Sequence, residues 1–202
     1  IGFAYSMIVF GLDIEEFEYA YRLDGPFDEK KGLRFDRTKI LLDPYARAVT
    51  GQSRWGHTNS ASHGYRARVV RSNFDWGPER HTQIPMEDLI IYELHVRGYT
   101  MDSSSGVTCP GTFHGLEEKI PYLKKLGINA VELMPIFEFD EMRDARLIDE
   151  NQLLDYWGYN PVCFFAPNTS YCSSVEYNRE GLELKKMIKT LHDNGIEVIL
   201  DV

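Results

Sequence analysis

The sequence of 202 residues has few cysteines and no long apolar run, and each shortage excludes a class of protein. Cys109, Cys163 and Cys172 are odd in number and form no Cys-x-x-Cys pair, so they do not predict a disulfide framework. We therefore expect a reducing compartment, the cytoplasm. No run approaches the roughly 18 to 20 apolar residues of a membrane helix, and we expect no membrane partner. The missing initiator methionine and the abrupt apolar start indicate a chain cut from a longer protein.

An excess of positive charge is also absent. Lys and Arg number 22 against 31 Asp and Glu, which gives a formal net charge of -9. A negative field repels polyanions such as nucleic acid, whereas a neutral ligand such as a sugar is indifferent to it. We expect no nucleic-acid partner, and the charge is compatible with a carbohydrate ligand.

The second half of the chain contains three apolar runs that predict strands. They lie at residues 89–96, 128–136 and 196–202 and are rich in Val, Ile and Leu. Near-continuous apolar runs are typical of strands in a parallel sheet, because helices cover both faces of such a sheet.

Helical spacing separates these runs. Between the first two, Leu116, Ile120 and Leu123 recur at helical intervals, and Gly127 supplies a stop. Between the second and third, an i, i+3, i+4, i+7 stripe is followed by Asn194-Gly195, which is typical of a helix end. This stripe consists of Leu184, Met187, Ile188 and Leu191.

Two folds fit this alternation: an open doubly wound sheet and the start of a (β/α)8 barrel. A nucleotide-binding sheet would carry Gly-x-Gly-x-x-Gly after its first strand, but Arg97-Gly98-Tyr99-Thr100 stands there. We therefore predict an α/β protein in which residues 86–202 form the first three βα units of a (β/α)8 TIM barrel.

Chemistry in such barrels lies at the C-terminal ends of the strands. The polar residues at these places are His95, Arg97, Glu138, the segment 156–159 and Asp201. A lone histidine without a Ser or Cys nucleophile is more often a satisfied core group than a catalyst, so we expect His95 to be structural. The carboxylate of Asp201 fits either a functional site or a structural role as the partner of Arg97 or of a backbone amide.

The acidic segment at residues 140–155 has no persistent apolar period and lacks the EF-hand spacing. It predicts a solvated loop rather than a calcium site, and we expect no metal. Upstream, residues 17–24 alternate apolar and polar side chains and end in a turn, which predicts a half-buried strand. We expect Trp55 and Trp76 to pack between domains.

Four segments in order along the chain have the sequences IIYELHVRGYT at 90–100, LGINAVELMPI at 126–136, YWGYN at 156–160 and GIEVILDV at 195–202. They resemble the α-amylase superfamily, glycoside hydrolase family 13, and most of all its isoamylase-type glycogen and starch debranching enzymes. Upstream, DGP at 24–26 and LLDPYA at 41–46 look like the end of the β-sandwich carbohydrate-binding module, similar to family 48, that precedes the barrel in these enzymes.

The resemblance implies three regions: a partial binding module at 1–50, a connector at 51–85 and the start of the catalytic barrel at 86–202. It also implies an enzyme that cleaves α-1,6 branch linkages in glycogen or starch with retention of configuration. The nucleophile, the acid/base and the third aspartate of the family follow the fourth, fifth and seventh strands. We therefore expect no catalytic residue and no activity in this chain, and no cofactor is implied.

The same resemblance assigns substrate contacts. Tyr159 matches the family tyrosine that stacks under the sugar at the scissile bond, Trp157 occupies the neighbouring position, and Asp201 matches the aspartate that supports the site after the third strand. The partner is then an α-glucan polysaccharide. Other possibilities stay open: a non-catalytic α-glucan-binding or regulatory protein, part of a branching enzyme or a pullulanase, or an unrelated (β/α)8 enzyme.

Overall fold

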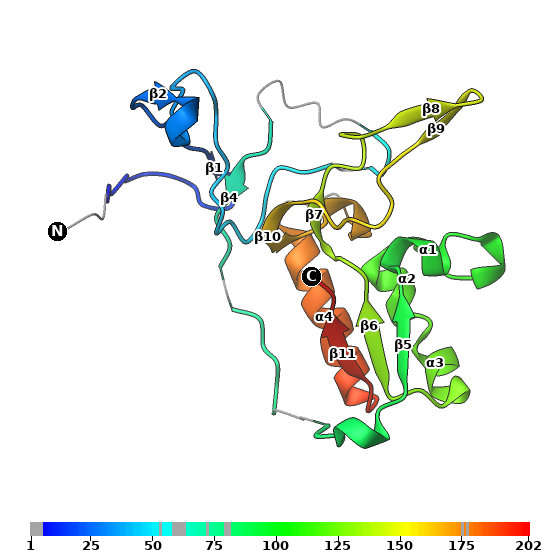
Figure 1. The fold of residues 1–202 in the computed structure, drawn as a ribbon. Helices are drawn as coiled ribbons and strands as arrows, with labels where there is room; N and C mark the ends of the chain where they lie inside the picture. The colour runs from blue at the N-terminus through cyan, green and yellow to red at the C-terminus, as the bar shows by residue number, and fades with distance from the viewer. Residues whose placement is uncertain are drawn as a thin grey trace.

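The structure is a computed structural model that describes residues 6–52, 54–57, 64–71, 73–78, 82–174, 176 and 178–202. A parallel sheet with its helices occupies one part of the molecule, and short antiparallel strand pairs from the N-terminal region lie apart from it (Figure 1). None of the helices in the described ranges has the length and apolarity needed to cross a membrane.

The parallel sheet contains the three predicted strands, each shorter than its apolar run. They are β5 (Ile91–Leu94), β6 (Ala130–Leu133) and β11 (Glu197–Leu200), in the order β11-β6-β5. Leu133 of β6 lies opposite both Leu94 and Leu200. The three strands therefore end at the same edge, and the α/β prediction is confirmed.

The first strand ends two residues earlier than its run predicts, because a helix begins there. The helix α1 (Val96–Thr100) has His95 as its N-cap, and the His95 side chain accepts a hydrogen bond from the Gly98 N–H. Satisfying this otherwise free amide stabilises the helix start. The 3-10 helix η3 (Ser103–Ser105) follows.

The helical stretch between β5 and β6 is split in two, into α2 (Phe113–Glu117) and α3 (Ile120–Leu126). The break precedes Pro121, which lacks an N–H and whose ring conflicts with the carbonyl four residues earlier. The predicted stripe is confirmed, since Leu116, Ile120 and Leu123 are all buried.

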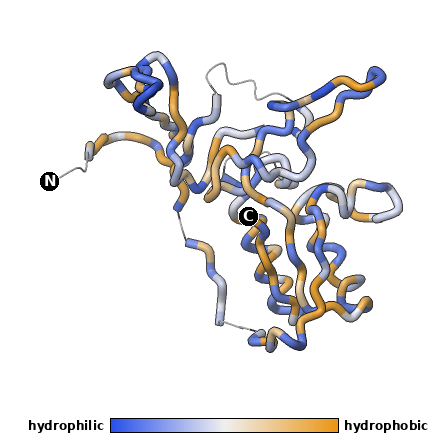
Figure 2. The backbone as a smooth tube through the Cα atoms, viewed as in Figure 1, coloured by the Kyte–Doolittle hydropathy of each residue, from blue (hydrophilic) through white to orange (hydrophobic). Residues whose placement is uncertain are grey.

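The helix α4 (Arg179–Asp193) leads to β11 and carries the second predicted stripe. Leu184, Met187 and Leu191 are buried, and Gly195 just beyond the helix has a left-handed φ of 76°. Apolar and polar segments alternate along α4 in Figure 2. These residues pack with Val131 and Leu133 of β6 in the main core. The opposite face of the sheet carries Glu93 and Glu132 side by side.

Two antiparallel pairs connect β6 to α4. The strand β7 (Phe137–Phe139) pairs with β10 (Pro161–Pro167), and β8 (Arg146–Ile148) pairs with β9 (Asn151–Leu153) in a projecting hairpin (Figure 1). The 3-10 helix η4 (Thr169–Tyr171) follows β10. The prediction of a solvated loop at 140–155 is therefore wrong in part, because cross-strand pairing orders the hairpin and because Glu141 is fully buried.

The N-terminal region contains β1 (Glu18–Tyr19) paired with β4 (Ala67–Arg68), and β2 (Phe27–Asp28) paired with β3 (Leu33–Arg34). The 3-10 helices η1 (Glu29–Lys31) and η2 (Met86–Asp88) complete it. The strand predicted at 17–24 is correct only for β1 and a bridge from Tyr21 to Leu41, since a period of two becomes a strand only where a partner strand pairs with it.

A second small core joins the N-terminal region to β10. Its buried members are Ala46, Val49, Ala67, Cys163 and Ala166, which come from all three predicted regions. The boundaries at residues 50 and 85 stay predictions, and in the structure the hydrogen-bonded pair of β1 and β4 connects the first two regions.

We expect Leu123→Ala to destabilise the chain by about 2–5 kcal/mol, because Leu123 is fully buried against the sheet and its truncation leaves a cavity. Leu126→Ala is the matched control, since Leu126 lies on the same helix but is 49% exposed. Urea unfolding followed by circular dichroism measures both. Equal losses would contradict the assignment of the buried face of α3.

Candidate functional site

The candidate site lies at the edge where the parallel strands end. Asp201 follows β11 directly, and its backbone N–H donates to the carbonyl of Leu133 at 3.0 Å, which continues the ladder one residue beyond the strand. Residues 156–159, between β9 and β10, reach the same edge and bring Tyr159 to Asp201. The sheet and this loop thus place two of the predicted site residues together.

Tyr159 and Asp201 form a direct hydrogen bond in which the Tyr159 hydroxyl donates to Oδ2 of Asp201. This bond, together with burial and the nearby charges of Asp201, Glu93 and Glu132, raises the pKa of Tyr159 to about 12. The carboxylate therefore holds the hydroxyl end of the Tyr159 ring and restricts its orientation. The partner of Asp201 is Tyr159, so the alternative pairing of Asp201 with Arg97 is wrong.

Trp157 is next to Tyr159 in space as well as in sequence. The two rings meet edge to face, with centroids 6.4 Å apart, and Trp157 is 62% exposed. Gly158 between them has a φ of 84°, and a Cβ there would lie 2.6 Å from the Phe139 ring. Glycine is thus required at position 158, both for the backbone conformation and for space beside Phe139.

A cavity of about 620 Å³ lies between these rings and the β8–β9 hairpin. Its lining residues include Arg146, Leu153, Asp155, Trp157, Tyr159 and Asn160. Sugars have flat apolar faces edged with hydroxyl groups, and binding sites for them combine exposed rings with a few polar side chains. The arrangement has the features needed to hold a sugar ring.

His95 lies beneath this loop and is buried. Its Nδ1 accepts from the Gly98 N–H at 3.0 Å, and its Nε2 lies 2.6 Å from the Tyr156 carbonyl oxygen. Burial, and the charge of nearby Arg97, lower the pKa of His95. The expectation of a satisfied core histidine is confirmed.

Trp55 is packed among other aromatic rings. Its ring stacks on Tyr171 with centroids 6.0 Å apart, and the Arg97 guanidinium lies 4.8 Å above its ring. Trp76 contacts Phe74 edge to face and remains 43% exposed. Trp55 therefore joins residues 54–57 to η4, and Arg97 is its cation-π partner.

The sequence did not predict the burial of two carboxyl groups, Glu138 at the strand end and Glu141 in the acidic segment. Glu138 accepts from the Thr169 N–H at 2.6 Å, and burial raises the pKa of Glu138 to about 8. Glu141 accepts from the Gly56 N–H at 2.8 Å, and burial also raises its pKa. Both hold neighbouring segments to the sheet region. No sequence signal distinguishes them from the exposed acids around them, because burial is a tertiary property.

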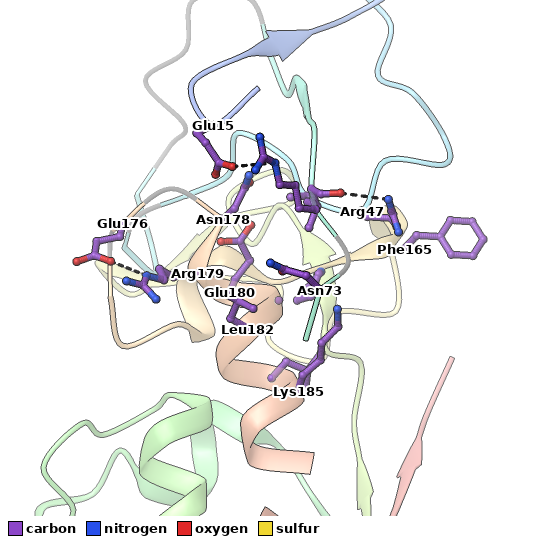
Figure 3. Close-up of a pocket in the computed structure, with 16 residues that line it drawn as sticks. Glu15, Arg47, Asn73, Phe165, Glu176, Asn178, Arg179, Glu180, Leu182 and Lys185 are labelled. Atoms are coloured by element: carbon purple, nitrogen blue, oxygen red, sulfur yellow. Dashed lines mark hydrogen bonds and ion pairs between the residues drawn. The ribbon is translucent and has the colours of Figure 1, made fainter. Parts of the chain in front are cut away.

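A different cavity, of about 590 Å³, lies beside the first turn of α4 (Figure 3). Arg179 is paired with Glu176 at 2.5 Å, and Arg71 with Glu15 at 3.3 Å. Phe165 borders the cavity, but in Figure 3 its ring points away from it. Paired guanidinium groups and the lack of an inward-facing ring make this cavity a poorer sugar site than the one at Tyr159. In the described part of the chain, no group of three His, Cys, Asp or Glu side chains is arranged to hold a metal.

Comparisons with known proteins show which family this chain resembles. A family model described as the alpha-amylase catalytic domain matches residues 62–202. Isoamylase 3, chloroplastic, of Oryza sativa subsp. japonica is 43% identical over 211 residues, which covers 100% of this chain and 27% of that protein. The glycogen operon protein GlgX homolog of Mycobacterium tuberculosis (strain ATCC 25618 / H37Rv) is 37% identical over 205 residues, covering 91% of this chain and 28% of that protein.

Among solved structures, a pullulanase from Anoxybacillus sp. LM18-11 complexed with maltotetraose matches with a TM-score of 0.62 and 29% identity. The match covers 81% of this chain and 24% of that one. The chain thus spans about a quarter of the length of the relatives that it matches.

We expect Asp201→Asn to lower the pKa of Tyr159 from about 12 toward the ordinary value of 10.0, because the hydrogen bond to the carboxylate is the largest cause of the shift. Since the folded pKa is the higher one, the stability that this bond adds is full below pH 10 and is lost as the pH rises through about 12. Ultraviolet difference titration measures it, with Tyr159→Phe identifying the transition. An unchanged titration in Asp201→Asn would refute the pairing.

We expect Gly158→Ala to destabilise the chain by about 2–4 kcal/mol, from left-handed backbone strain plus overlap with Phe139. Gly127→Ala is the control, because Gly127 has a similar φ of 88° and nothing within 4 Å of a new Cβ. It should lose only about 1–2 kcal/mol. Urea unfolding of both variants separates the two effects, and equal losses would argue against the close approach to Phe139.

Proposed function

The chain belongs to the alpha-amylase family, and from this premise we propose that the whole protein is a debranching glycoside hydrolase. In this proposal it cleaves α-1,6 branch linkages in glycogen or a starch-like α-glucan. The observation that carries the proposal is the Tyr159–Asp201 pair at the ends of the parallel strands, with the exposed ring of Trp157 beside it.

The names of the relatives support this choice of reaction. The matching curated proteins include isoamylases and a glycogen debranching enzyme of Yersinia enterocolitica, which is 39% identical over 199 residues. The solved structures include pullulanases bound to maltotetraose and to maltose.

We propose that the three-stranded sheet is the start of a (β/α)8 barrel and that residues 1–50 are the end of a β-sandwich carbohydrate-binding module. The face of the sheet that the helices cover would then be the outer face of the barrel wall, and the face bearing Glu93 and Glu132 would be the inner one. Barrel sites lie at strand ends, and the placement of Asp201 just after β11 is compatible with this architecture.

In the proposed mechanism, this chain binds the sugar and the reacting carboxyl groups belong to strands outside it. A retaining glycosidase needs a carboxylate nucleophile and a carboxylic acid about 5–5.5 Å apart. Glu138 and Glu141 do not fit these roles, because both are buried and engaged with backbone amides. The Tyr159 ring would stack on the sugar, Trp157 would border the subsite, and Asp201 would hold the Tyr159 ring in place.

We further propose that the protein works in a reducing compartment, the cytoplasm. Cys109, Cys163 and Cys172 are all free thiols in the structure. Burial raises the pKa of the Cys172 thiol to about 12, so this cysteine stays protonated and unreactive. Free thiols of this kind persist where glutathione and thioredoxin keep cysteines reduced.

The test is release of reducing ends from glycogen by the full reading frame. We expect Tyr159→Ala to lower kcat/KM about 10- to 100-fold, because the ring that positions the sugar is lost. Tyr122→Ala is the matched control, since Tyr122 is 50% exposed against 49% for Tyr159 but lies on α3, away from the strand ends.

Equal activity of the two variants would remove the assigned role of Tyr159. Absence of any debranching activity in the full reading frame, together with retained glycogen binding, would establish a non-catalytic binding protein instead.

A further inference from the structure

His95 is placed to do more than fill the core, because both of its ring nitrogens contact backbone groups that shape the site. It stands between β5 and α1, at the strand edge that Asp201 also occupies. Nδ1 accepts from the Gly98 N–H at 3.0 Å, and Nε2 faces the Tyr156 carbonyl oxygen at 2.6 Å. The histidine thus joins the start of α1 to the first residue of the 156–159 loop.

These two contacts fix the tautomer of His95. An amide N–H can only donate, so Nδ1 must carry a lone pair, and a carbonyl oxygen can only accept, so Nε2 must carry the proton. The ring is therefore neutral with its hydrogen on Nε2. Burial lowers the pKa of His95, which favours this neutral form near pH 7.

Tyr156 is held at three points. Its carbonyl accepts from Nε2 of His95, and its ring stacks on the His95 ring with centroids 4.1 Å apart and an interplanar angle of 9°. Its hydroxyl occupies the space that a Cβ at position 98 would need, so the glycine there allows the approach. A side chain restrained in this way leaves its backbone little freedom.

Aromatic packing makes the His95–Tyr156 pair rigid. Trp55 meets the rings of His95 and Tyr156 edge to face, at 6.3 and 6.2 Å. The Tyr171 hydroxyl lies 3.2 Å from Nε2 of His95 and is fully buried. A ring enclosed on this many sides keeps a single orientation, as side chains that support functional groups require.

The restraint passes along only a few bonds to the sugar-binding rings. Tyr156 is followed by Trp157, Gly158 and Tyr159, and Gly158 is itself pressed against Phe139. Because the backbone is fixed at positions 156 and 158, the side chains of Trp157 and Tyr159 leave it in defined directions. The restricted loop therefore keeps the Tyr159 hydroxyl within hydrogen-bond distance of Asp201.

We propose that His95 is a positioning residue for the sugar site: its Nε2–H holds the Tyr156 carbonyl and thereby orients Trp157 and Tyr159. The inference rests on the proposed function for its consequence, the binding of an α-glucan. Its structural part, the coupling of His95 to the Tyr159–Asp201 hydrogen bond, can be measured without any substrate.

Two substitutions separate the hydrogen bond from the stacking. His95→Phe keeps a flat ring on Tyr156 but cannot donate to its carbonyl. His95→Gln removes the ring but keeps a donor for the Tyr156 carbonyl and an acceptor for the Gly98 N–H. If the hydrogen bond positions the loop, His95→Phe is the impaired variant and His95→Gln is the rescuing one.

The first readout is the ultraviolet titration of Tyr159 in the full reading frame. We expect the transition near pH 12 to move toward 10 in His95→Phe and to stay in place in His95→Gln. The second readout is binding of maltotetraose by isothermal titration calorimetry. We expect the dissociation constant to be about tenfold larger in His95→Phe, which corresponds to one lost hydrogen bond of about 1.4 kcal/mol.

A purely structural role would give a different pattern. If His95→Phe only lowered the fraction of folded protein, the amount of ligand bound at saturation would fall while the dissociation constant and the Tyr159 titration stayed unchanged, and the proposal would be overturned. A shifted titration with no maltotetraose binding in the unsubstituted protein would support the positioning role and refute the proposed function. Equal behaviour of both variants would refute the assignment to the hydrogen bond.

Discussion

The parallel pairing of β6 with β5 on one side and β11 on the other is the constraint on which the rest of the structure depends. Parallel strands in register end at one edge, so Leu94, Leu133 and Leu200 are opposite one another, and the residues after them meet. This pairing places Asp201 at the site, where its backbone N–H donates a hydrogen bond to the Leu133 carbonyl. Burial of the Leu and Val face under the helices keeps this register, because a slip by one residue would turn the apolar face outward.

The loop that completes the site depends on a second, aromatic layer. The rings of His95, Trp55, Tyr156 and Tyr171 pack against one another, and both ring nitrogens of His95 have hydrogen-bond partners. His95 follows β5, Trp55 lies in segment 54–57 and Tyr171 belongs to η4, so the layer joins segments that are far apart in the sequence. A loop without regular hydrogen bonding can be rigid only if packing of this kind takes the place of a strand ladder.

Burial also gives similar residues different roles. Glu138 and Glu141 lie beside exposed acids in the sequence, yet each is buried and holds a backbone amide, and burial raises the pKa of both. Asp201 remains half-buried at the strand edge and binds a tyrosine hydroxyl. These three carboxyl groups therefore hold backbone segments or an aromatic ring in place.

The sequence by itself determined the alternation of strands and helices, the buried stripes of α3 and α4, and the identity of Tyr159, Trp157 and Asp201 as candidates. These properties are local: an apolar period, a glycine at a helix end, or a motif of a few residues. Only the tertiary structure decided that Tyr159 donates to Asp201, that His95 holds the Tyr156 carbonyl, and that Glu138 and Glu141 are buried. The two contacts join residues far apart in the chain, and burial depends on distant segments as well. No local sequence pattern predicts such properties, because they exist only once packing has brought the elements together.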